Sequence, residues 1–349
     1  MENIKSIMQK PLEDLHNQYS QVSAIKTLYR NPLGFIDIGA RGGFHPVMDN
    51  LRKLTAVMGF EPDKTGYNDL INSPNYNQNW AVTEILPIAL GHKRETRDLN
   101  LHSVPTNHSL LPSNPIFVER YKMEKWKLVG KEAMKTMSLD EILAQREDKE
   151  IKWGEIIKLD TQGTEYEILQ GAIETLRQNT VAVICEVSFC ELYQGQKLFS
   201  DVELFLREIG FSFYGFNESH FRSTKRFNKR TTRTRERIIQ ADAIFFKDPF
   251  DQENTFELSI RQAQVLSICA MQLGFFDYAE EVADKLWAND DDLKLFKSLL
   301  NLLSNKSPAD TYENLKSLYK KVRENIDDAN VVVGKYIDEH RHFNDFSEF

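Results

Sequence analysis

The sequence has few cysteines, no long apolar run and no excess of positive charge. Its three cysteines, Cys185, Cys190 and Cys269, show no C-x-x-C spacing and no histidine partners at zinc-ligand distances, which argues against a zinc site or a disulfide framework. We expect reduced, buried thiols, because the count is odd and Cys185 lies in an apolar stretch. No apolar run reaches membrane-spanning length, and the first residues are too polar for a signal peptide. These absences predict a cytoplasmic protein.

The composition predicts a globular protein of one large domain or two ordinary ones. Of the 349 residues, 41% are hydrophobic, which is enough for a core, and 28% are charged. The net charge of -8 disfavours general affinity for nucleic acid or anionic membranes, although a local basic segment could still act.

The most informative stretch is a short apolar run that opens into a cluster of small residues, Phe35-Ile-Asp-Ile-Gly-Ala-Arg-Gly-Gly-Phe44. This pattern predicts a buried strand that ends in a tight turn, where glycines let backbone N–H groups face a ligand. A dinucleotide fingerprint would require glycines at positions 41 and 44, where this chain has arginine and phenylalanine. The spacing is closer to the acid-x-Gly-x-Gly-x-Gly loop of S-adenosylmethionine (SAM) dependent methyltransferases. Such a loop calls for a second acid after the next strand, and Glu61 follows Thr55–Phe60 in that position.

A second strand, turn and helix pattern begins at Glu155. Its apolar run ends in Asp160, turns at Gly163 and continues into a helix that we expect to end near Asn179, with Thr164 and Glu167 as a capping box. Open α/β sheets place ligands at the carboxyl ends of such strands. Further strands are predicted at 83–91, 99–104, 135–137, 180–187, 211–216 and 241–246, with short helices at 65–71, 139–143 and 201–209.

Two regions lie outside this α/β pattern. Residues 1–32 predict an amphipathic helical arm that packs on a domain or on a partner, and residues 250–349 predict helices for oligomerisation or substrate covering. Residues 33–249 remain as the central α/β domain. Within it, the segment 222–237 carries eight Lys or Arg and one acid. This segment is either a solvated hairpin extension or an arm that recruits an anionic substrate, such as a phosphorylated or carboxylated sugar.

Together these stretches resemble the FkbM family of SAM-dependent methyltransferases over about residues 35–247. The segments that carry the resemblance are 35–43, Gly59-Phe-Glu-Pro-Asp63, Ala89-Leu-Gly91, Ser138–Leu143, Ile157–Ala172 and Ala241–Phe246. The resemblance implies a class I methyltransferase fold, a seven-stranded, mostly parallel sheet with the last strand antiparallel, here with a C-terminal helical appendage. It also implies O-methylation of sugars or polyketide-type hydroxyls. The family often has Glu at position 162, where this chain has Gln, and Ser-Ser-Leu at 108–110, where this chain has His-Ser-Leu.

The resemblance implies SAM as the cofactor, with roles for the residues that match the family pattern. Gly39, Ala40 and Gly43 would shape the loop under the methionine part, Asp37 would order that loop or bind the ammonium, and Glu61 would accept the ribose hydroxyls. The adenine would lie along Ala89–Gly91. The full set of predicted cofactor residues is Asp37, Gly39, Ala40, Arg41, Gly43, Glu61, Pro62, Ala89, Leu90, Gly91 and Asp160.

Transfer to a hydroxyl benefits from a positioned base. The candidates are Asp160, Glu165, Glu186, His45 and His108. Asp160 comes first because its strand end faces the cofactor in this topology. Glu165 has an alternative role as a first-turn acid that favours the helix dipole. Because these carboxylates are scattered in the sequence, we predict no metal site.

Two other functions are compatible with the sequence. A non-catalytic protein could keep the nucleoside-binding sheet and use its C-terminal helices to hold partners in a polysaccharide-assembly complex. An RNA methyltransferase could use the segment 222–237, but the overall acidity and the lack of an aromatic-interleaved RNA module disfavour it. The intact cofactor motifs favour the methyltransferase of a sugar or glycan hydroxyl.

Overall fold

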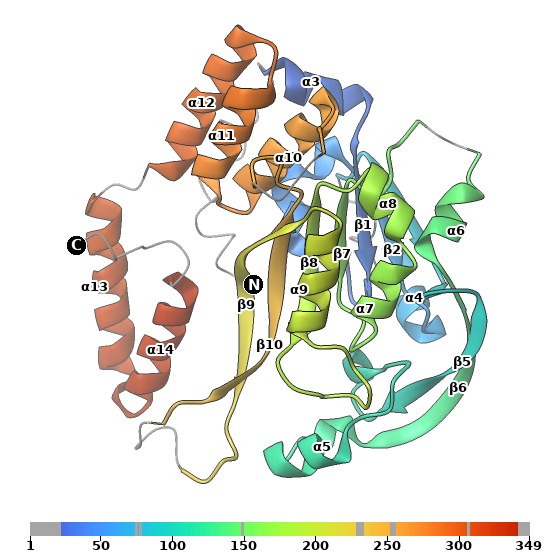
Figure 1. The fold of residues 1–349 in the computed structure, drawn as a ribbon. Coiled ribbons are helices and arrows are strands. Elements are labelled where there is room, and N and C mark those ends of the chain that lie inside the picture. The colour runs from blue at the N-terminus through green and yellow to red at the C-terminus, as the bar shows by residue number, and fades with distance from the viewer. Residues whose placement is uncertain are drawn as a thin grey trace.

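The computed structural model describes residues 22–73, 76, 79–147, 150–227, 234–251, 256–305 and 308–340. Its centre is a seven-stranded sheet in the order β3-β2-β1-β7-β8-β10-β9 (Figure 1). All neighbours pair in parallel except β10, which runs antiparallel to both β8 and β9. The seven strands are β1 (Leu33–Ile38), β2 (Thr55–Phe60), β3 (Val82–Leu86), β7 (Ile156–Leu159), β8 (Ala182–Ser188), β9 (Ser212–Arg222) and β10 (Arg237–Phe246). The predicted fold is confirmed, including the antiparallel last strand.

Helices cover both faces of this sheet because its strands are apolar on both sides. On β1, Phe35 packs into a core with the helices of one face, and the next residue, Ile36, packs into a second core on the other face. The first face is covered by α3 (Ser23–Arg30), η1 (Pro46–Leu54), α10 (Ile260–Gln272), α11 (Phe276–Leu286) and α12 (Asp290–Ser304). The second is covered by α6 (Leu139–Ala144), α7 (Glu165–Gln170), α8 (Ile173–Gln178) and α9 (Phe199–Glu208).

The C-terminal helices therefore divide into two groups. Helices α10–α12 share a core with the sheet, and the Arg261 guanidinium of α10 bonds the buried Glu155 carboxylate, with 2.6 Å between Nε and Oε1. Helices α13 (Pro308–Glu324) and α14 (Ala329–His340) pair with each other beside the sheet (Figure 1). All of these helices lie within the range 250–349, for which the sequence predicts helices. Of the predicted N-terminal arm, the described part is helical from Ser23 to Arg30, and the rest lies outside the described residues.

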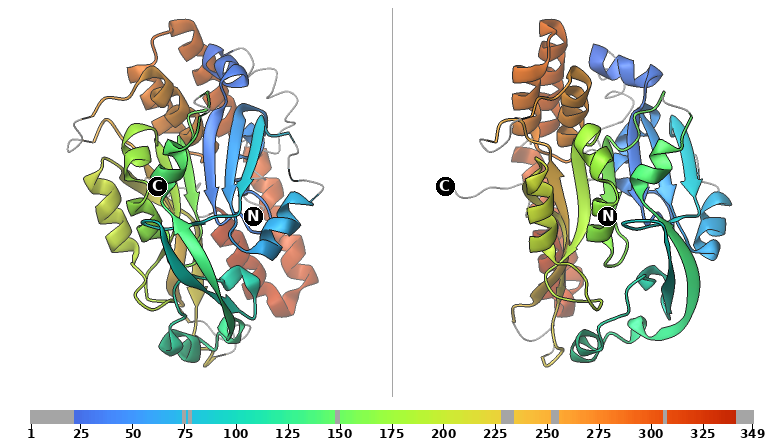
Figure 2. Two further views of the ribbon diagram at one scale, coloured as in Figure 1. Left: turned by 90° about the vertical axis from the view of Figure 1, so that its right-hand side faces the viewer. Right: turned by 45° about the vertical axis from the view of Figure 1, so that its right-hand side comes forward.

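A second sheet of three strands, β4-β6-β5, lies beyond the carboxyl end of the first. Its strands are β4 (Ala89–Leu90), β5 (Glu95–His102) and β6 (Leu128–Met137), and between β5 and β6 lie η2 (Pro105–Asn107), α5 (Pro115–Tyr121) and η3 (Glu124–Trp126). Figure 2 shows β5 and β6 curving away from the main sheet toward α5. The remaining short helix, α4 (Lys64–Ile71), follows β2.

Four local predictions were wrong. The predicted strand at 83–91 is two strands, β3 and β4, in different sheets, because Pro87 between them cannot donate a ladder hydrogen bond. The predicted helix after Gly163 breaks at Gly171, where a side chain would meet the Gly91 carbonyl oxygen at 2.3 Å. The Thr164–Glu167 capping box does not form, because Thr164 bonds Thr161 and Glu167 pairs with Arg97.

The fourth concerns the cysteines. All three thiols are free, but only Cys185 and Cys269 are buried. Cys190 is half-buried, because it follows β8 at the edge of a small cluster around Tyr193.

Candidate active site

A cleft lies at the carboxyl ends of β1, β2 and β7, facing the second sheet. It holds about 820 Å³ of empty space, open solvent included. Its walls come from the turns after β1, β2 and β7, from the segment 88–90 and from the segment 105–110. Its polar and glycine residues include Gly39, Arg41, Glu61, Asp63, Thr106, His108, Ser109, Asp160, Thr161, Gln162 and Thr164.

The turn after β1 is held tightly against the neighbouring strands. The N–H groups of Gly39 and Ala40 both donate to the Phe60 carbonyl oxygen at 3.1 Å, and Gly39 has a φ of 92°. A Cβ on Gly39 would lie 1.9 Å from the Asp160 carbonyl oxygen. Only glycine fits there, so the turn after β1 touches the turn after β7.

The carboxylate of Asp37 holds the turn after β1 in place. It is buried in β1 and its Oδ2 accepts the His45 N–H at 2.6 Å, which closes the loop 39–45. Burial raises the pKa of Asp37 to about 7, although the His45 N–H and the nearby Lys158 ammonium oppose that shift. Asp37 does not line the cleft, so of its two predicted roles the loop-ordering one agrees with its position.

Glu61 is a buried acid with one carboxylate oxygen available to a ligand. Its Oε1 accepts the Asp63 N–H at 2.8 Å, while Oε2 accepts no hydrogen bond from any residue in the described part of the chain. Burial raises the pKa of Glu61, and the Asp63 N–H and the Arg41 charge lower it. Arg41 in turn forms an ion pair with Asp63, with 2.9 Å between Nη1 and Oδ2. Both residues line the cleft, so the ion pair fixes their side chains there.

Asp160 and Glu186 are joined by the side chain of Gln162. The Gln162 amide donates to Asp160 Oδ1 at 2.8 Å and to Glu186 Oε2 at 3.2 Å, and its Oε1 accepts the Tyr193 hydroxyl at 2.9 Å. Gln162 adopts a left-handed backbone with a φ of 59°, and its carbonyl oxygen accepts the Ser109 hydroxyl at 2.7 Å. A chain of hydrogen bonds thus fixes the Asp160 carboxylate at the wall of the cleft.

Glu186 lies behind this wall in a partly buried position of β8. Burial raises the pKa of its carboxyl well above the usual range, and the nearby Asp160, Glu165 and Asp242 charges add to that effect. Its Oε2 also accepts a hydrogen bond from the Gln240 amide at 3.0 Å. Burial and the nearby charges both favour the neutral form of the Glu186 carboxyl.

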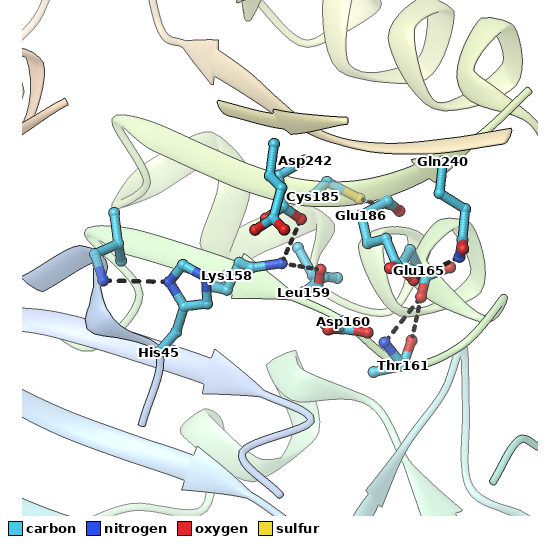
Figure 3. A network of polar contacts seen from close by, with 12 residues as sticks. His45, Lys158, Leu159, Asp160, Thr161, Glu165, Cys185, Glu186, Gln240 and Asp242 are labelled. Atoms are coloured by element: carbon cyan, nitrogen blue, oxygen red, sulfur yellow. Dashed lines mark hydrogen bonds and ion pairs between the residues drawn. The ribbon is translucent and has the colours of Figure 1, made fainter. Parts of the chain in front are cut away.

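Glu165 is occupied by backbone groups. Its Oε1 accepts the Thr161 N–H at 2.8 Å and its Oε2 the Gly163 N–H at 3.1 Å, so the carboxylate fixes the turn before α7 (Figure 3). Burial raises its pKa, and these N–H groups oppose the shift. It does not line the cleft.

The two candidate histidines lie in different surroundings. His45 is in the buried network beside Lys158, where burial lowers its pKa to about 4 (Figure 3). His108 lines the cleft, and its Nδ1 accepts the His102 N–H at 3.1 Å. Burial lowers the His108 pKa, as does the Arg41 charge. A neutral His108 ring with Nδ1 as acceptor carries its proton on Nε2, so it presents a donor to the cleft.

A buried ion pair between Lys158 and Asp242 lies next to these carboxyl groups. Lys158 is 1% exposed, and its Nζ donates to Asp242 Oδ1 at 2.9 Å and to the Leu159 carbonyl oxygen at 3.1 Å. Burial lowers the Lys158 pKa, but the carboxylates of Asp242 and Asp160 outweigh it and the net direction is upward. Lys158 thus stays charged and compensates the acids around it (Figure 3).

The structure brings together eight of the predicted residues in one cleft. These are Gly39, Arg41, Glu61, Pro62, Ala89, Leu90, His108 and Asp160. The remaining ones lie around it without lining it: Asp37, Ala40, Gly43, Gly91, His45, Glu165 and Glu186. Among residues 22–340 as far as they are described, no cluster of His, Cys, Asp or Glu is arranged to hold a metal ion.

The sequence prediction missed Asp63, Ser109, Gln162 and Tyr193. Asp63 had a signal, since an acid after Pro62 is a natural N-cap, and its Oδ2 accepts the Gly66 N–H at 2.8 Å. Gln162 also had a signal, because it is a position at which the chain departs from the family pattern. Nothing in the sequence connected Tyr193 with Gln162.

The sheet order, the reversed last strand and the cleft at the strand ends define the class I methyltransferase fold. The model of the methyltransferase FkbM domain matches residues 37–213, about half of the chain. The chain belongs to this family of methyltransferases. The comparison with curated proteins finds no match.

The chain is similar to three solved structures at low sequence identity. The FkbM methyltransferase from Methylobacillus flagellatus is 14% identical, with a TM-score of 0.35 over 65% of this chain and 47% of that one. The magnesium protoporphyrin IX methyltransferase of Synechocystis with bound SAM is 12% identical, with a TM-score of 0.30 over 71% and 83%. A putative tRNA (m1A22) methyltransferase of Streptococcus pneumoniae is 8% identical, with a TM-score of 0.31 over 80% and 97%. The match thus spans about half the length of the Methylobacillus protein.

Proposed function

We propose that this protein transfers a methyl group from SAM to a hydroxyl of a sugar, glycan or related metabolite. The observation that carries the proposal is the position of Glu61, a buried acid with an available oxygen beside the glycine turn and opposite Asp160 in one cleft. A ribose offers two hydroxyl donors, which suit the Glu61 carboxylate. When bound, SAM supplies an electrophilic methyl group.

The residues around Glu61 fit the other parts of the cofactor. The glycine turn at Gly39 lines the cleft and would lie under the methionine part. Arg41 and Asp63 form an ion pair at the rim, where they would bracket the charged methionine end. Ala89 and Leu90 give an apolar wall for the adenine. Gly43 and Gly91 would contribute to the cofactor site only through the backbone conformation of their turns.

On the acceptor side, Asp160 is the proposed base. Its carboxylate lines the cleft and is oriented by Gln162, so it would accept the proton of a hydroxyl positioned for in-line attack. His108 would donate a hydrogen bond to the acceptor rather than accept its proton, because its Nδ1 is already an acceptor. Glu165 and His45 would order the turns on either side of the cleft.

The choice of a sugar hydroxyl depends on the family resemblance. The basic residues of the outer β9–β10 hairpin would attract an acceptor that carries negative charge, such as a phosphorylated or carboxylated saccharide. The three free thiols are compatible with a reducing, cytoplasmic location.

The experiment that tests this function is methyl transfer from labelled SAM to a panel of hydroxylated glycans and nucleotide sugars. We expect at least one acceptor to gain the label in amounts that match the S-adenosylhomocysteine formed. Transfer to RNA but to no saccharide, with a steep salt dependence, would contradict the proposed acceptor class.

A further inference from the structure

One end of the molecule carries basic and large apolar side chains on two segments that are distant in the sequence. These segments are α5 with its continuation into β6, and the described residues 222–227 and 234–237 between β9 and β10. Both lie at the lower end of the molecule in Figure 1 and in both views of Figure 2. We call this end the basic-apolar end.

The α5 segment contributes exposed apolar residues among exposed cations. Ile116 is 76% exposed and Val129 63% exposed. Exposed apolar residues that gather in one place, unlike single ones, often mark an interaction surface. The exposed cations of the same segment are Arg120, Lys122, Lys125 and Lys127.

The hairpin segment repeats this combination. Phe227 is 66% exposed, next to the exposed Lys225 and Arg226. On the returning strand, Arg235 and Arg237 are also exposed. A large aromatic beside clustered cations is typical of a surface that enters the interface of a bilayer.

The two segments are held together by an aromatic cluster. Phe117, Tyr121 and Trp126 pack with Tyr193 and with Ile239 of β10. The Arg237 guanidinium donates to the Phe189 carbonyl oxygen at 3.5 Å, and the Asn114 side-chain amide donates to the Glu191 carbonyl oxygen at 3.0 Å. This cluster fixes α5 against β10, so the two segments lie at one supported end of the molecule.

This surface borders the cleft. Tyr193 stacks on Trp126 with 4.8 Å between ring centroids, and its hydroxyl bonds both Gln162 and the Asn107 carbonyl oxygen. One layer of side chains thus separates the basic-apolar end from the wall that holds Asp160.

We propose that the basic-apolar end docks on an anionic phospholipid bilayer, so that the cleft receives a hydroxyl of a membrane-anchored saccharide. The cations would attract anionic headgroups, and Ile116, Val129 and Phe227 would enter the headgroup region. A net charge of -8 for the whole chain orients the molecule, because the rest of it is repelled by the same surface. Among the described residues no helix is long and apolar enough to cross a membrane, so docking is peripheral. The acceptor part of this proposal rests on the proposed function.

Vesicle flotation of the full chain tests the docking. The vesicles are phosphatidylcholine alone or phosphatidylcholine mixed with phosphatidylglycerol. We expect binding to the mixed vesicles that weakens with salt, an at least tenfold loss in Lys225→Glu/Arg226→Glu, and a smaller loss in Ile116→Ser/Phe227→Ser. The matched controls, Lys320→Glu/Lys321→Glu and Tyr312→Ser/Leu315→Ser, change equally exposed groups of α13 and should bind as the unmodified protein does.

Failure of docking and failure of the proposed function are separable. Absence of vesicle binding, equal losses in the control variants, or binding to RNA or heparin but not to vesicles would each overturn the docking. SAM titration reports on the cleft independently, and all four variants should bind SAM normally because none touches it. A protein that floats with vesicles but binds no SAM would refute the proposed function and leave the docking in place.

Discussion

Replacing Asp160 by Asn is expected to lower the rate of methyl transfer by about 10²- to 10⁴-fold with little change in SAM affinity. The asparagine keeps the shape of the side chain, and its oxygen still accepts the Gln162 amide, so the cleft wall stays in place. Only the capacity to take the proton of the acceptor is lost. Single-turnover rates with saturating SAM, measured beside SAM titrations, separate the two effects.

The matched control is Glu186→Gln. Burial raises the pKa of the Glu186 carboxyl and so favours its neutral form, which an amide of the same shape resembles. Its oxygen can still accept the amides of Gln162 and Gln240. We expect a rate within a few-fold of the unmodified enzyme. A severe loss in Glu186→Gln with an unaffected Asp160→Asn would transfer the role of base to Glu186.

The second large effect is on stability. Gly39→Ala and Gly42→Ala both put a side chain on a backbone of positive φ, 92° and 83°, which costs about 1 kcal/mol in each. At Gly42 nothing lies within 4 Å of the new Cβ, whereas at Gly39 the Asp160 carbonyl oxygen lies at 1.9 Å. That oxygen belongs to the backbone between β7 and α7 and cannot swing aside.

We therefore expect Gly39→Ala to lower the free energy of unfolding by about 1–3 kcal/mol more than Gly42→Ala does. Urea denaturation of the two variants measures the difference. Equal stability of the two would mean that the turns after β1 and β7 are not in contact, and the cleft described above would be wrong.

Much of the fold could be predicted from the sequence because its signals are local. The run from Phe35 to Gly39 encodes a buried strand and its turn, and parallel strands that end in polar residues bring those residues to one edge. Glu61 and Asp160 both line the cleft for that reason. The C-terminal helices followed from apolar spacing alone, although the core that α10–α12 form with the first face of the sheet did not.

The rest depends on contacts between distant residues. The Tyr193 hydroxyl contacts Gln162 only because the segment after β8 folds back toward the turn after β7. The periodicity of apolar residues in the sequence does not predict this path. Lys158 occupies a position in β7 where an apolar residue is expected, and its role appears only with Asp242, 84 residues away, beside it. Pro87 was visible in the sequence, but its consequence, two strands in different sheets, depends on the pairing of β4 with β6.

The most direct test of the central proposal is calorimetric titration of the purified protein with SAM and S-adenosylhomocysteine, beside Glu61→Ala. The proposal predicts saturable binding to the unmodified protein and a loss of about 100-fold or more in Glu61→Ala, because hydrogen bonds to a charged acceptor contribute about 1.5–3 kcal/mol each. Glu95→Ala removes an exposed acid of β5 and should bind normally. Binding that Glu61→Ala retains in full, or no binding to either compound, would contradict a SAM site in this cleft. The second result would favour a non-catalytic protein that holds partners through its helices.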